Sequence, residues 1–568
     1  MIDPGNTLLA MARGDIPADL VFKNGRVVDV FSGKLVETDV AVGQGIILGM
    51  GSYRGHEEID LAGSILSPGF IDGHCHVESC MLAVGEFARC LSALGTTTVF
   101  ADPHEIANVA GLDGIRYLLA EGSQYPWNFY LMLPSCVPSS PWETAGAVLE
   151  AKDLEKLINE QGVFGLGEVM NCPGVIQGDA NLWQKLKLFS NRFIDGHAPG
   201  VTGKDLNAYL QGGICADHEV TTPEEALEKV RAGMYVMIRE GSAARNLTAL
   251  LKAVDAKNFN RFFFATDDRH PGDLIARGHI NWMLMEATRL GVDPIDAIRL
   301  ATINTATAMG VNNIGAIAPG RKADLLVLED LVQFKPARVY KDGKLVAKDG
   351  QALFAFQDEK PLPKKIAHSV HIKGLSREKF ILPPANSYRV IQLIPGQIIT
   401  AEGKATAQQV ADLAANDLAL LAVVERHHGS GRVGLGLIQG LGLKQGAIAA
   451  SVSHDSHHVI VAGLNPEDMV AAVEAIIEMQ GGLAVVAQEK VLASLALPIA
   501  GLMSPEPLET VAAKVEALEA AAQELGVRGD SPFMTLSFMA LPVIPALKLT
   551  DKGLVDVVQF RPVPLELE

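Results

Sequence analysis

The sequence predicts an α/β protein: a (β/α)8 TIM-like barrel, a small composite β-domain from the segments that flank it, and a C-terminal α/β domain. Three observations support this prediction. Short apolar runs alternate with helical stretches in the first half of the chain, which is typical of parallel barrels. Similar strand-turn-strand segments precede and follow this region. The pattern then changes after Pro361-Leu-Pro-Lys-Lys, and 568 residues allow two to four domains.

The composite β-domain is expected from residues 1–66 and 320–360. Residues 19–30 hold a Lys-Asn-Gly turn between apolar runs, which is a strong hairpin signal. Residues 338–347 repeat the pattern with an Asp-Gly turn. We expect the two flanks to pair in one domain, and two unrelated β-elements are the alternative.

The catalytic barrel is expected from residues 67–319. Segments such as Pro223–Ala232 and Asp273–Leu290 have helical periodicity and separate the strands. Active sites of such barrels form at the C-terminal ends of the strands, so polar residues there should converge. The predicted strands are Phe70–His76, Thr97–Asp102, Asn128–Pro134, Val163–Glu168, Arg192–His197, Gly213–His218, Tyr235–Arg239 and Arg261–Asp267.

The C-terminal α/β domain is expected from residues 365–568, with amphipathic helices at Pro466–Met479 and Leu508–Leu525. It contains two histidine-rich blocks. Three roles are open for them: to reach the mouth of the active site, to bind a further metal, or to satisfy one another in a core. The histidines concerned are His427, His428, His454, His457 and His458.

Composition narrows the function classes. No window has about 18 uninterrupted apolar residues, which predicts no membrane span. The N-terminus lacks a basic region followed by an apolar run, and the six cysteines form no Cys-x-x-Cys pair. Both features favour a cytoplasmic enzyme with reduced thiols. A net charge of −18 disfavours nucleic acids and anionic membranes as partners, and a homo-oligomer is the default expectation.

A metal site is the chemistry that the strand ends predict. His74 and His76 lie one residue apart in a predicted strand, so their side chains share a face. Histidines and a carboxylate at other strand ends add to this pair, and such a mixture suits zinc, iron or manganese. A centre of this kind lowers the pKa of bound water. Glu168, at the end of the fourth strand, is able to bridge two ions through its two oxygens.

Longer motifs give a family resemblance. Residues 68–79, Pro-Gly-Phe-Ile-Asp-Gly-His-Cys-His-Val-Glu-Ser, resemble the first-strand signature of the amidohydrolase superfamily. The extension to Met81, with residues 102–108, 167–171 and 453–457, resembles the adenine deaminase family in particular. The likeness covers nearly the whole chain. Gly73 and Cys75 depart from the usual Ala and Val, at positions that are not ligands.

The resemblance implies a metal-dependent hydrolase that converts adenine and water to hypoxanthine and ammonia. It implies two divalent ions per chain, of manganese, iron or zinc. Glu168 stands where many hydrolases of the superfamily have a carboxylated lysine. The metal ligands implied are His74, His76, Glu168, His197, His218 and Asp267.

Within this reading, metal-activated hydroxide attacks C6 of adenine and a carboxylate passes the proton to the leaving amine. Asp267 is the first choice for that proton transfer, because a strand-end aspartate touches both metal and hydroxide. Glu219, beside His218, is the alternative acid or base, and its other reading is a charge at a helix N-terminus. The remaining candidates orient the purine or its activated water (His104, Glu105) or contact the ring nitrogens (Ser242, Asp268, Arg269).

Three other functions compete with this one. A hydrolase of cyclic amides generally relies on a carboxylated bridging lysine, and Glu168 argues against it. A deaminase of another nucleobase shares the chemistry but lacks the long motif matches. A non-catalytic scaffold has no need to keep six ligands.

Overall fold

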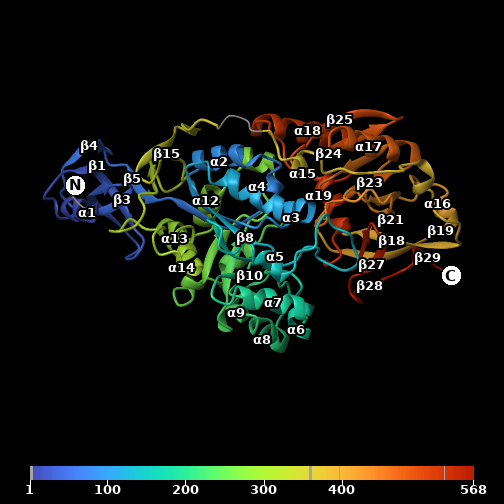
Figure 1. Ribbon diagram of the computed structural model, residues 1–568, viewed down its shortest axis with the longest axis horizontal. Helices are drawn as coiled ribbons and strands as arrows, with labels where there is room; N and C mark the ends of the chain where they lie inside the picture. The colour runs from blue at the N-terminus through green and yellow to red at the C-terminus, as the bar shows by residue number, and fades with distance from the viewer. Residues whose placement is uncertain (1–3, 243, 357–360, 396, 530, 568) are drawn as a thin grey trace.

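The computed structural model describes residues 4–242, 244–356, 361–395, 397–529 and 531–567. The molecule is elongated (Figure 1). A sheet that contains the N-terminal strands lies at one end, parallel strands and their helices lie in the middle, and the part from residue 361 onward, the C-terminal unit, lies at the other end. No helix in the described part of the chain is both long and apolar enough to cross a membrane.

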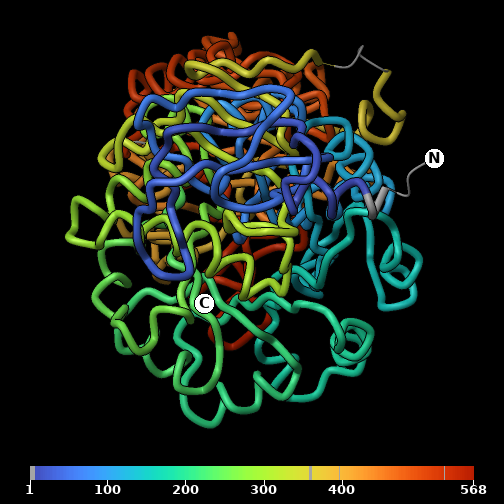
Figure 2. The backbone as a smooth tube through the Cα atoms, turned by 90° about the vertical axis from the view of Figure 1, so that its left-hand side faces the viewer, coloured from blue at the N-terminus to red at the C-terminus, as the bar shows by residue number. Residues whose placement is uncertain are grey.

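Strands from both flanks of the barrel region form one nine-stranded sheet, in the order β17-β16-β15-β14-β5-β1-β2-β3 with β4 beside β1. The two flanks meet where β14 pairs antiparallel with β5, with Leu326 opposite Ser67. Figure 2 looks onto this end, with the N-terminal segment in front. Helix α1 (Pro4–Arg13) precedes the strands β1 (Ala18–Asp29), β2 (Lys34–Gly43), β3 (Ile46–Met50), β4 (Gly55–Asp60), β5 (Ile65–Pro68), β14 (Leu325–Leu328), β15 (Pro336–Lys341), β16 (Lys344–Lys348) and β17 (Gln351–Ala352).

One of the two predicted turns in this sheet is wrong. The Lys-Asn-Gly segment is a bulge inside β1, where the register with β2 shifts between Phe22 and Gly25. Asn24 has a φ of 54°, and a Cβ at Gly25 would lie 2.4 Å from Leu61 Cδ1. Residues that tolerate positive φ serve bulges as well as turns, so the dipeptide alone could not separate the two. The Asp-Gly turn is confirmed between β15 and β16, where both residues have positive φ.

The structure has a strand at each of the eight predicted barrel positions. They form a parallel five-stranded sheet, β10-β9-β8-β7-β6, and a parallel three-stranded sheet, β11-β12-β13. Backbone hydrogen bonds join the sheets at both edges, from Cys215 N to Ile194 O at 2.9 Å and from Asp267 N to His74 O at 2.9 Å. The strands are β6 (Phe70–Cys75), β7 (Thr96–Ala101), β8 (Asn128–Leu133), β9 (Val163–Val169), β10 (Ile194–Gly196), β11 (Ala216–Asp217), β12 (Tyr235–Arg239) and β13 (Phe262–Ala265).

Helices follow these strands, and the predicted helix at 223–232 is confirmed. The predicted helix at 273–290 is instead two helices, because Gly278, with φ of 87°, interrupts it. The helices are α2 (Val84–Ala93), α3 (His104–Ala110), α4 (Leu112–Gly122), α5 (Ala151–Leu154), α6 (Cys172–Gln177), α7 (Ala180–Leu188), α8 (Gly203–Leu210), α9 (Pro223–Arg231), α10 (Leu247–Leu250), α11 (Pro271–Ala276), α12 (Ile280–Arg289), α13 (Pro294–Leu300) and α14 (Ile303–Met309), with short 3-10 turns at Glu78–Cys80, Leu251–Ala253 and Phe259–Arg261.

Large apolar side chains fill the space between the parallel strands. Ile71, Phe100, Met132, Met237 and Phe263 form one buried cluster. In the part of the chain that the structure describes, the space between these strands is therefore a packed core, and the C-terminal strand ends are the expected place for polar chemistry.

The C-terminal unit is built on a second nine-stranded sheet, β19-β18-β21-β20-β23-β22-β24-β25 with β29 beside β18, and a three-stranded sheet, β26-β27-β28. Its strands are β18 (Ser387–Leu393), β19 (Thr400–Thr406), β20 (Leu418–Val424), β21 (Val433–Gln439), β22 (Ala447–Ala450), β23 (Val459–Gly463), β24 (Gly482–Ala487), β25 (Lys490–Ala496), β26 (Leu547–Thr550), β27 (Gly553–Asp556), β28 (Arg561–Pro562) and β29 (Glu566–Leu567).

The two helices predicted for this unit are present. Helix α17 (Pro466–Glu478) buries Met469 and Ile476 in a core confined to the unit. Helix α18 (Leu508–Glu524) buries Val511 in the core that continues into the barrel helices. The shorter helices are α15 (Lys364–Ala367), α16 (Ala407–Val410) and α19 (Pro532–Ser537), with 3-10 turns at Arg377–Phe380 and Phe538–Ala540.

A long loop after β8, the docking loop (residues 134–150), contacts the C-terminal unit. Thr144 donates to Asp551 through its backbone N at 2.9 Å and its Oγ1 at 2.7 Å. Lys552 Nζ donates to Glu143 O at 2.7 Å, and Thr550 Oγ1 donates to Trp142 O at 2.7 Å. These bonds and the shared apolar core fix the C-terminal unit against the barrel.

Glu143 is buried in this contact. Its carboxylate accepts hydrogen bonds from Ser139 Oγ at 2.6 Å, Ser140 N at 3.0 Å and Ser456 Oγ at 2.5 Å. Burial raises the pKa of Glu143 to about 7, because it outweighs the lowering by the bonds from Ser139 and Ser456.

The Glu143→Gln variant should show what this proton does for stability. The pKa of Glu143 is higher in the folded chain than its ordinary 4.5, so the folded state holds more protons between pH 4.5 and 7. The stabilisation is complete below pH 4.5 and is lost as the pH rises through 7. We expect the Tm of wild type to fall by a few degrees relative to Glu143→Gln across that window. A constant Tm difference would contradict this, and exposed Glu155→Gln is the control.

Candidate metal centre

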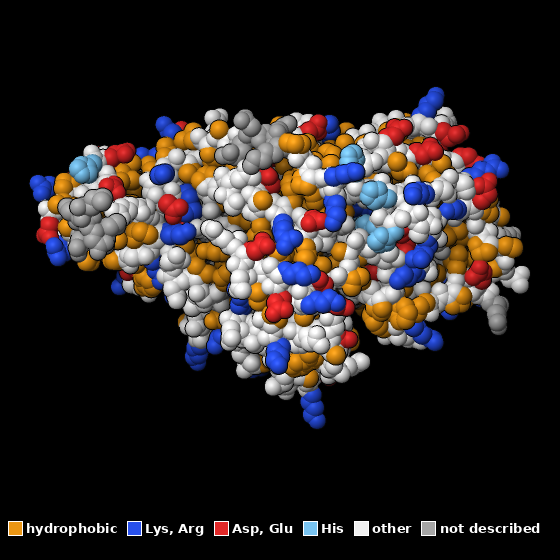
Figure 3. Space-filling model, viewed as in Figure 1, with side chains coloured by type: hydrophobic (Ala, Val, Ile, Leu, Met, Phe, Trp, Pro, Cys, Tyr) orange, Lys and Arg blue, Asp and Glu red, His pale blue; other side chains and the backbone are white. Residues whose placement is uncertain are grey.

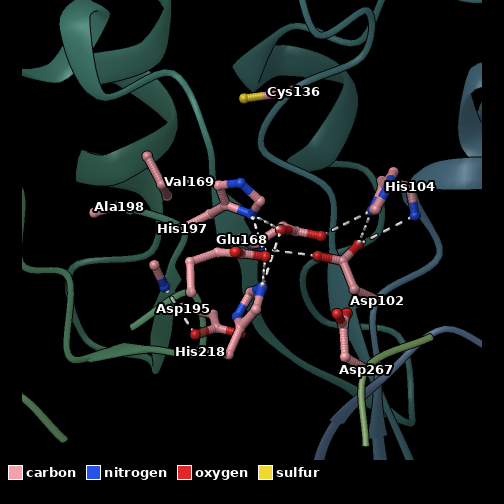
Figure 4. A network of polar contacts seen from close by, with 12 residues as sticks. Asp102, His104, Cys136, Glu168, Val169, Asp195, His197, Ala198, His218 and Asp267 are labelled. Carbon is pink, nitrogen blue, oxygen red and sulfur yellow. Dashed lines mark hydrogen bonds and ion pairs between the residues drawn. The ribbon is translucent and has the colours of Figure 1, made fainter. Parts of the chain in front are cut away.

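All six predicted metal ligands lie together at the C-terminal ends of the barrel strands. His74 is the last but one residue of β6, His76 directly follows this strand, and Glu168 is in β9. His197 and His218 directly follow β10 and β11, and Asp267 lies two residues after β13. Figure 4 shows Glu168 in the middle, with His197 and His218 on one side and Asp102 and His104 on the other. His197 is half-buried and the rest are buried.

The hydrogen bonds of His74 and His76 decide which ring nitrogens face the centre. His76 Nδ1 lies 3.0 Å from the carbonyl oxygen of Asp102, which can only accept, so Nδ1 carries the hydrogen. His74 Nδ1 lies 2.8 Å from Asp195 Oδ2, a carboxylate oxygen, so its Nδ1 also donates. In the neutral form of each ring, which is the form that binds a metal, Nε2 therefore keeps the lone pair.

These lone pairs point at one another and at carboxylates. The two Nε2 atoms are 3.1 Å apart, and Asp267 Oδ1 lies 3.4 Å from His74 Nε2 and 3.2 Å from His76 Nε2. Glu168 Oε1 lies 3.4 Å from His76 Nε2. Acceptors at such distances repel one another unless a cation lies among them. The group therefore fits a divalent metal.

A second group shares Glu168. Its Oε2 lies 2.5 Å from His197 Nδ1 and 3.3 Å from His218 Nε2, and the three side chains converge closely enough to hold an ion. Glu168 thus faces one group with each oxygen. A bridging carboxylate has this arrangement.

Both carboxylates are held ionised. Burial raises the pKa of Asp267, but the charge of Arg239 and the contacts with His74 and His76 outweigh it and hold the pKa well below the usual range. Burial likewise raises the pKa of Glu168, and His197 and His218 lower it well below the usual range. Ionised carboxylates are the form that binds a cation.

The sequence analysis missed the carboxylates that orient the ligands. Asp195 Oδ1 accepts from Gly196 N at 2.8 Å while Oδ2 holds His74, and Asp102 Oδ2 accepts from Glu168 N at 2.8 Å. Asp72 accepts from His74 N at 3.3 Å. A signal was present, because an aspartate stands two residues before His74, His104 and His197. Such partners fix the tautomer and direction of a metal-binding histidine.

Arg239 was also missed, and it joins the two acid/base candidates. Its Nη1 lies 2.8 Å from Asp267 Oδ2, and it forms a two-pronged ion pair with Glu219, in which Nη2 donates to Oε2 at 2.8 Å. Glu219 Oε1 lies 3.7 Å from His197 Nδ1 and 3.8 Å from His218 Nε2. Glu219 is thus at the centre and is not a solvated helix-end charge.

A pocket opens next to these residues. Glu168, Asp267, Glu219 and Arg239 form its floor. His104, Glu105 and Asp268 line its side, where Ser79 Oγ lies 2.7 Å from Glu105 Oε1 and 2.5 Å from Asp268 Oδ1. The other wall comes from the C-terminal unit and is largely apolar: Ile398, His454, Asp455, Phe538, Leu541, Val543 and Ile544.

Two predicted substrate contacts lie elsewhere. The Arg269 guanidinium is buried and donates to the backbone oxygens of Gly278, at 2.8 and 3.1 Å, and Glu240, at 2.9 Å. Ser242 Oγ accepts from His270 N at 2.8 Å. Neither is among the described residues that line the pocket. Both stabilise the loops that follow β12 and β13, a role that a strand-end position alone does not distinguish from substrate contact.

The five C-terminal histidines divide into different roles. His454 lines the pocket. His427 Nε2 and His428 Nε2 lie 2.7 and 2.9 Å from the backbone oxygens of Ser456 and Ala145, and His458 Nε2 lies 3.5 Å from Asp551. His457 Nδ1 accepts from Ser453 N at 3.1 Å, so its hydrogen is on Nε2, 3.5 Å from Glu105 Oε2. A protonated nitrogen is no metal ligand, which argues against a further ion between Glu105, His454 and His457.

The buried charges contrast with the surface. On the face shown in Figure 3, acidic and basic side chains are interspersed, while the carboxylates and Arg239 of the centre are buried. Charges gathered away from water interact strongly, which suits a site that stabilises charge during a reaction.

Comparisons with known proteins show the family of the chain. The amidohydrolase family model matches residues 65–346, and the model of the adenine deaminase C-terminal domain matches residues 397–561. The chain is 50% identical over 554 residues to the adenine deaminase of Petrotoga mobilis, covering 97% of each chain. It is 50% identical over 571 residues to adenine deaminase 2 of Carboxydothermus hydrogenoformans, covering 99% of this chain and 100% of the relative. Identity to the adenine deaminase of Desulfatibacillum aliphaticivorans is 47% over 571 residues, covering 100% of both.

The Asp195→Asn variant should weaken metal retention. The amide can turn its NH2 group toward His74 Nδ1, which removes the acceptor that keeps Nε2 free for a metal. We expect an affinity about 10- to 100-fold lower, read by competition with a graded series of chelators. Exposed Asp205→Asn is the control. Equal affinity in both variants would show that Asp195 does not orient His74.

Proposed function

The chain belongs to the adenine deaminase family within the amidohydrolases and converts adenine to hypoxanthine and ammonia, and we propose that the strand-end cluster of histidines and carboxylates is where this occurs. The observation that carries the proposal is the convergence of His74 Nε2, His76 Nε2 and Asp267 Oδ1 within 3.4 Å of one another, while the Nδ1 atoms of both histidines are held by other acceptors. A divalent cation bound there satisfies all three atoms at once.

We propose two ions per chain, of manganese, iron or zinc. The nitrogen-rich ligand set supports these metals over calcium or magnesium. The position of Glu168, with one oxygen toward each group, supports the second ion. The proposed ligands are His74, His76, Glu168, His197, His218 and Asp267. Bound there, a divalent ion supplies Lewis acidity and lowers the pKa of water so that it is a nucleophile at neutral pH.

We propose that Asp267 moves the proton. Its Oδ1 faces the histidine nitrogens and its Oδ2 is held by Arg239, so the carboxylate is fixed and ionised at the floor of the pocket. An ionised carboxylate there can take a proton from the attacking water and give it to the leaving amine. Glu219, paired with the same arginine, remains the alternative acid or base.

The pocket side supplies groups for the purine ring. Burial and the charges of Glu78 and Asp268 raise the pKa of Glu105 to about 8, so its carboxyl keeps a proton at neutral pH. A neutral carboxyl donates a hydrogen bond to a ring nitrogen, and an oxygen of Asp268 accepts one. His104 also lines the pocket, and its Nδ1 lies 3.3 Å from Glu168 Oε1. These positions support roles in orienting adenine.

The same proposal extends to the architecture. The hydrogen bonds across both edges of the parallel sheets support one closed (β/α)8 barrel. We propose that it spans residues 67–319, that residues 1–66 and 320–360 form the composite β-domain, and that residues 365–568 form the C-terminal domain. The β14–β5 pairing supports the composite.

Turnover by the reconstituted protein tests the function. Apo-protein loaded with manganese, iron or zinc should release ammonia from adenine and hold two ions per chain. Cyclic amides such as hydantoin, and the bases guanine and cytosine, should not be turned over. A fully loaded protein that is inert to adenine and opens cyclic amides would contradict the assignment.

Paired variants separate the two acid/base candidates. If Asp267 moves the proton, Asp267→Asn should lower kcat, normalised to the metal content, about 10²- to 10⁴-fold. Glu219→Gln keeps the shape of the side chain and should lower kcat much less. Metal content is measured for each variant, because Asp267 is also a proposed ligand. The reverse order, with metal content equal, would give the role to Glu219.

A further inference from the structure

The barrel supplies only part of the pocket. His454 and Asp455 lie in the connection between β22 and β23, and Phe538 and Leu541 lie at and just after the turn that follows α19. All four belong to the C-terminal unit and line the same pocket as Glu168, Asp267, Glu219 and Arg239. None of the reaction roles above uses them.

The connection that carries Asp455 is held on both sides. His454 N donates to Ser537 Oγ at 3.1 Å, and Ser456 Oγ donates to Glu143 of the docking loop at 2.5 Å. Residues 451–458 are buried throughout. The position of Asp455 is therefore fixed relative to the barrel as well as within its own unit.

Two polar atoms on this wall are unsatisfied. Asp455 Oδ2 and His454 Nε2 have no hydrogen-bond partner among the described residues, although both side chains are at most 5% exposed. Asp455 Oδ1 is 3.7 Å from His104 Nε2 and 3.9 Å from His454 Nδ1, beyond normal hydrogen-bond length. A buried carboxylate oxygen without a donor is unfavourable. A ligand with an N–H group would relieve this cost by donating a hydrogen bond to it.

The distance between Asp455 and the floor of the pocket determines which edge of a bound purine lies next to Asp455. His104 lies between them, with Nδ1 3.3 Å from Glu168 Oε1 and Nε2 toward Asp455. Asp455 is thus one imidazole ring away from the reacting end of the pocket. In adenine, C6 is at one end of the molecule and the N9–H donor is on the other ring. Phe538, Leu541 and Ile544 are apolar and suit the faces of a flat ring.

We propose that Asp455 accepts the N9–H hydrogen of the free base, so that the C-terminal unit makes the enzyme discriminate against purines substituted at N9. This inference rests on the proposed function, since it assumes that C6 lies at the metal floor. A nucleoside has no hydrogen at N9, and its sugar would meet the Asp455 carboxylate. His454 Nε2, next to it, is available to the neighbouring ring nitrogen.

Such a contact is distant from the bond that breaks, so it acts equally on bound substrate and transition state. Its loss raises KM and leaves kcat largely unchanged. A positioning role through His104 would instead lower kcat. The KM-against-kcat split therefore separates substrate recognition from an effect on the reacting groups.

The experiment compares adenine with 9-methyladenine on the full, metal-loaded chain. Wild type should prefer adenine strongly. In Asp455→Ala, kcat/KM for adenine should fall about 10- to 100-fold through KM, while 9-methyladenine loses nothing or gains, so the preference shrinks by the same factor. Asp455→Asn keeps the volume of the side chain, and its preference for adenine should lie between those of wild type and Asp455→Ala.

The matched control is Asp468→Ala, which removes a buried carboxylate of the same unit outside the pocket. It should leave both KM values unchanged. An unchanged preference in both Asp455 variants, or a fall in kcat at constant KM, would overturn the inference while ammonia release by wild type upholds the function. Wild type that releases no ammonia from adenine would overturn both.

Discussion

The structure depends on a set of lone pairs that cannot satisfy one another. His74 Nδ1 donates its hydrogen to Asp195, and His76 Nδ1 donates its hydrogen to the carbonyl oxygen of Asp102. Their Nε2 atoms then meet at 3.1 Å beside Asp267, and in the neutral rings both carry lone pairs. Water could relieve such a cluster only in part, whereas a divalent cation satisfies every member at once. The outer hydrogen bonds thus determine the chemistry of the inner ones.

The parallel strands stabilise this arrangement because different positions along each strand have different roles. Ligands stand at the strand ends, and aspartates before several of them, such as Asp72 and Asp195, accept backbone or imidazole N–H groups. Buried negative charge accumulates as a result, and Arg239 offsets part of it by pairing with both Asp267 and Glu219. A buried arginine without these partners would be strongly unfavourable, and the partners without the arginine would repel one another.

Sequence reasoning reached the parts of this site that follow from a periodic rule. The His74-x-His76 spacing and the polar residues at strand ends predicted ligands that do converge. It failed where only three-dimensional neighbours decide. Arg269 follows a strand as Asp268 does, yet its guanidinium donates its hydrogen bonds to backbone oxygens. Asn24 and Gly25 allow positive φ, which serves the observed bulge as well as the predicted turn. The wall from the C-terminal unit lies more than 130 residues along the chain from the last of the proposed ligands, Asp267, so no local pattern could place it.

A site of this kind needs a second unit for a physical reason. The ends of barrel strands are open, and water there would screen the charges that the centre collects. The apolar side chains of Phe538, Leu541 and Ile544 in this wall displace that water. The docking loop fixes the wall through Glu143, Thr144 and their partners in the C-terminal unit. Closure is therefore part of the folded state of both units, and the electrostatics of the centre depends on an interface that contains none of its ligands.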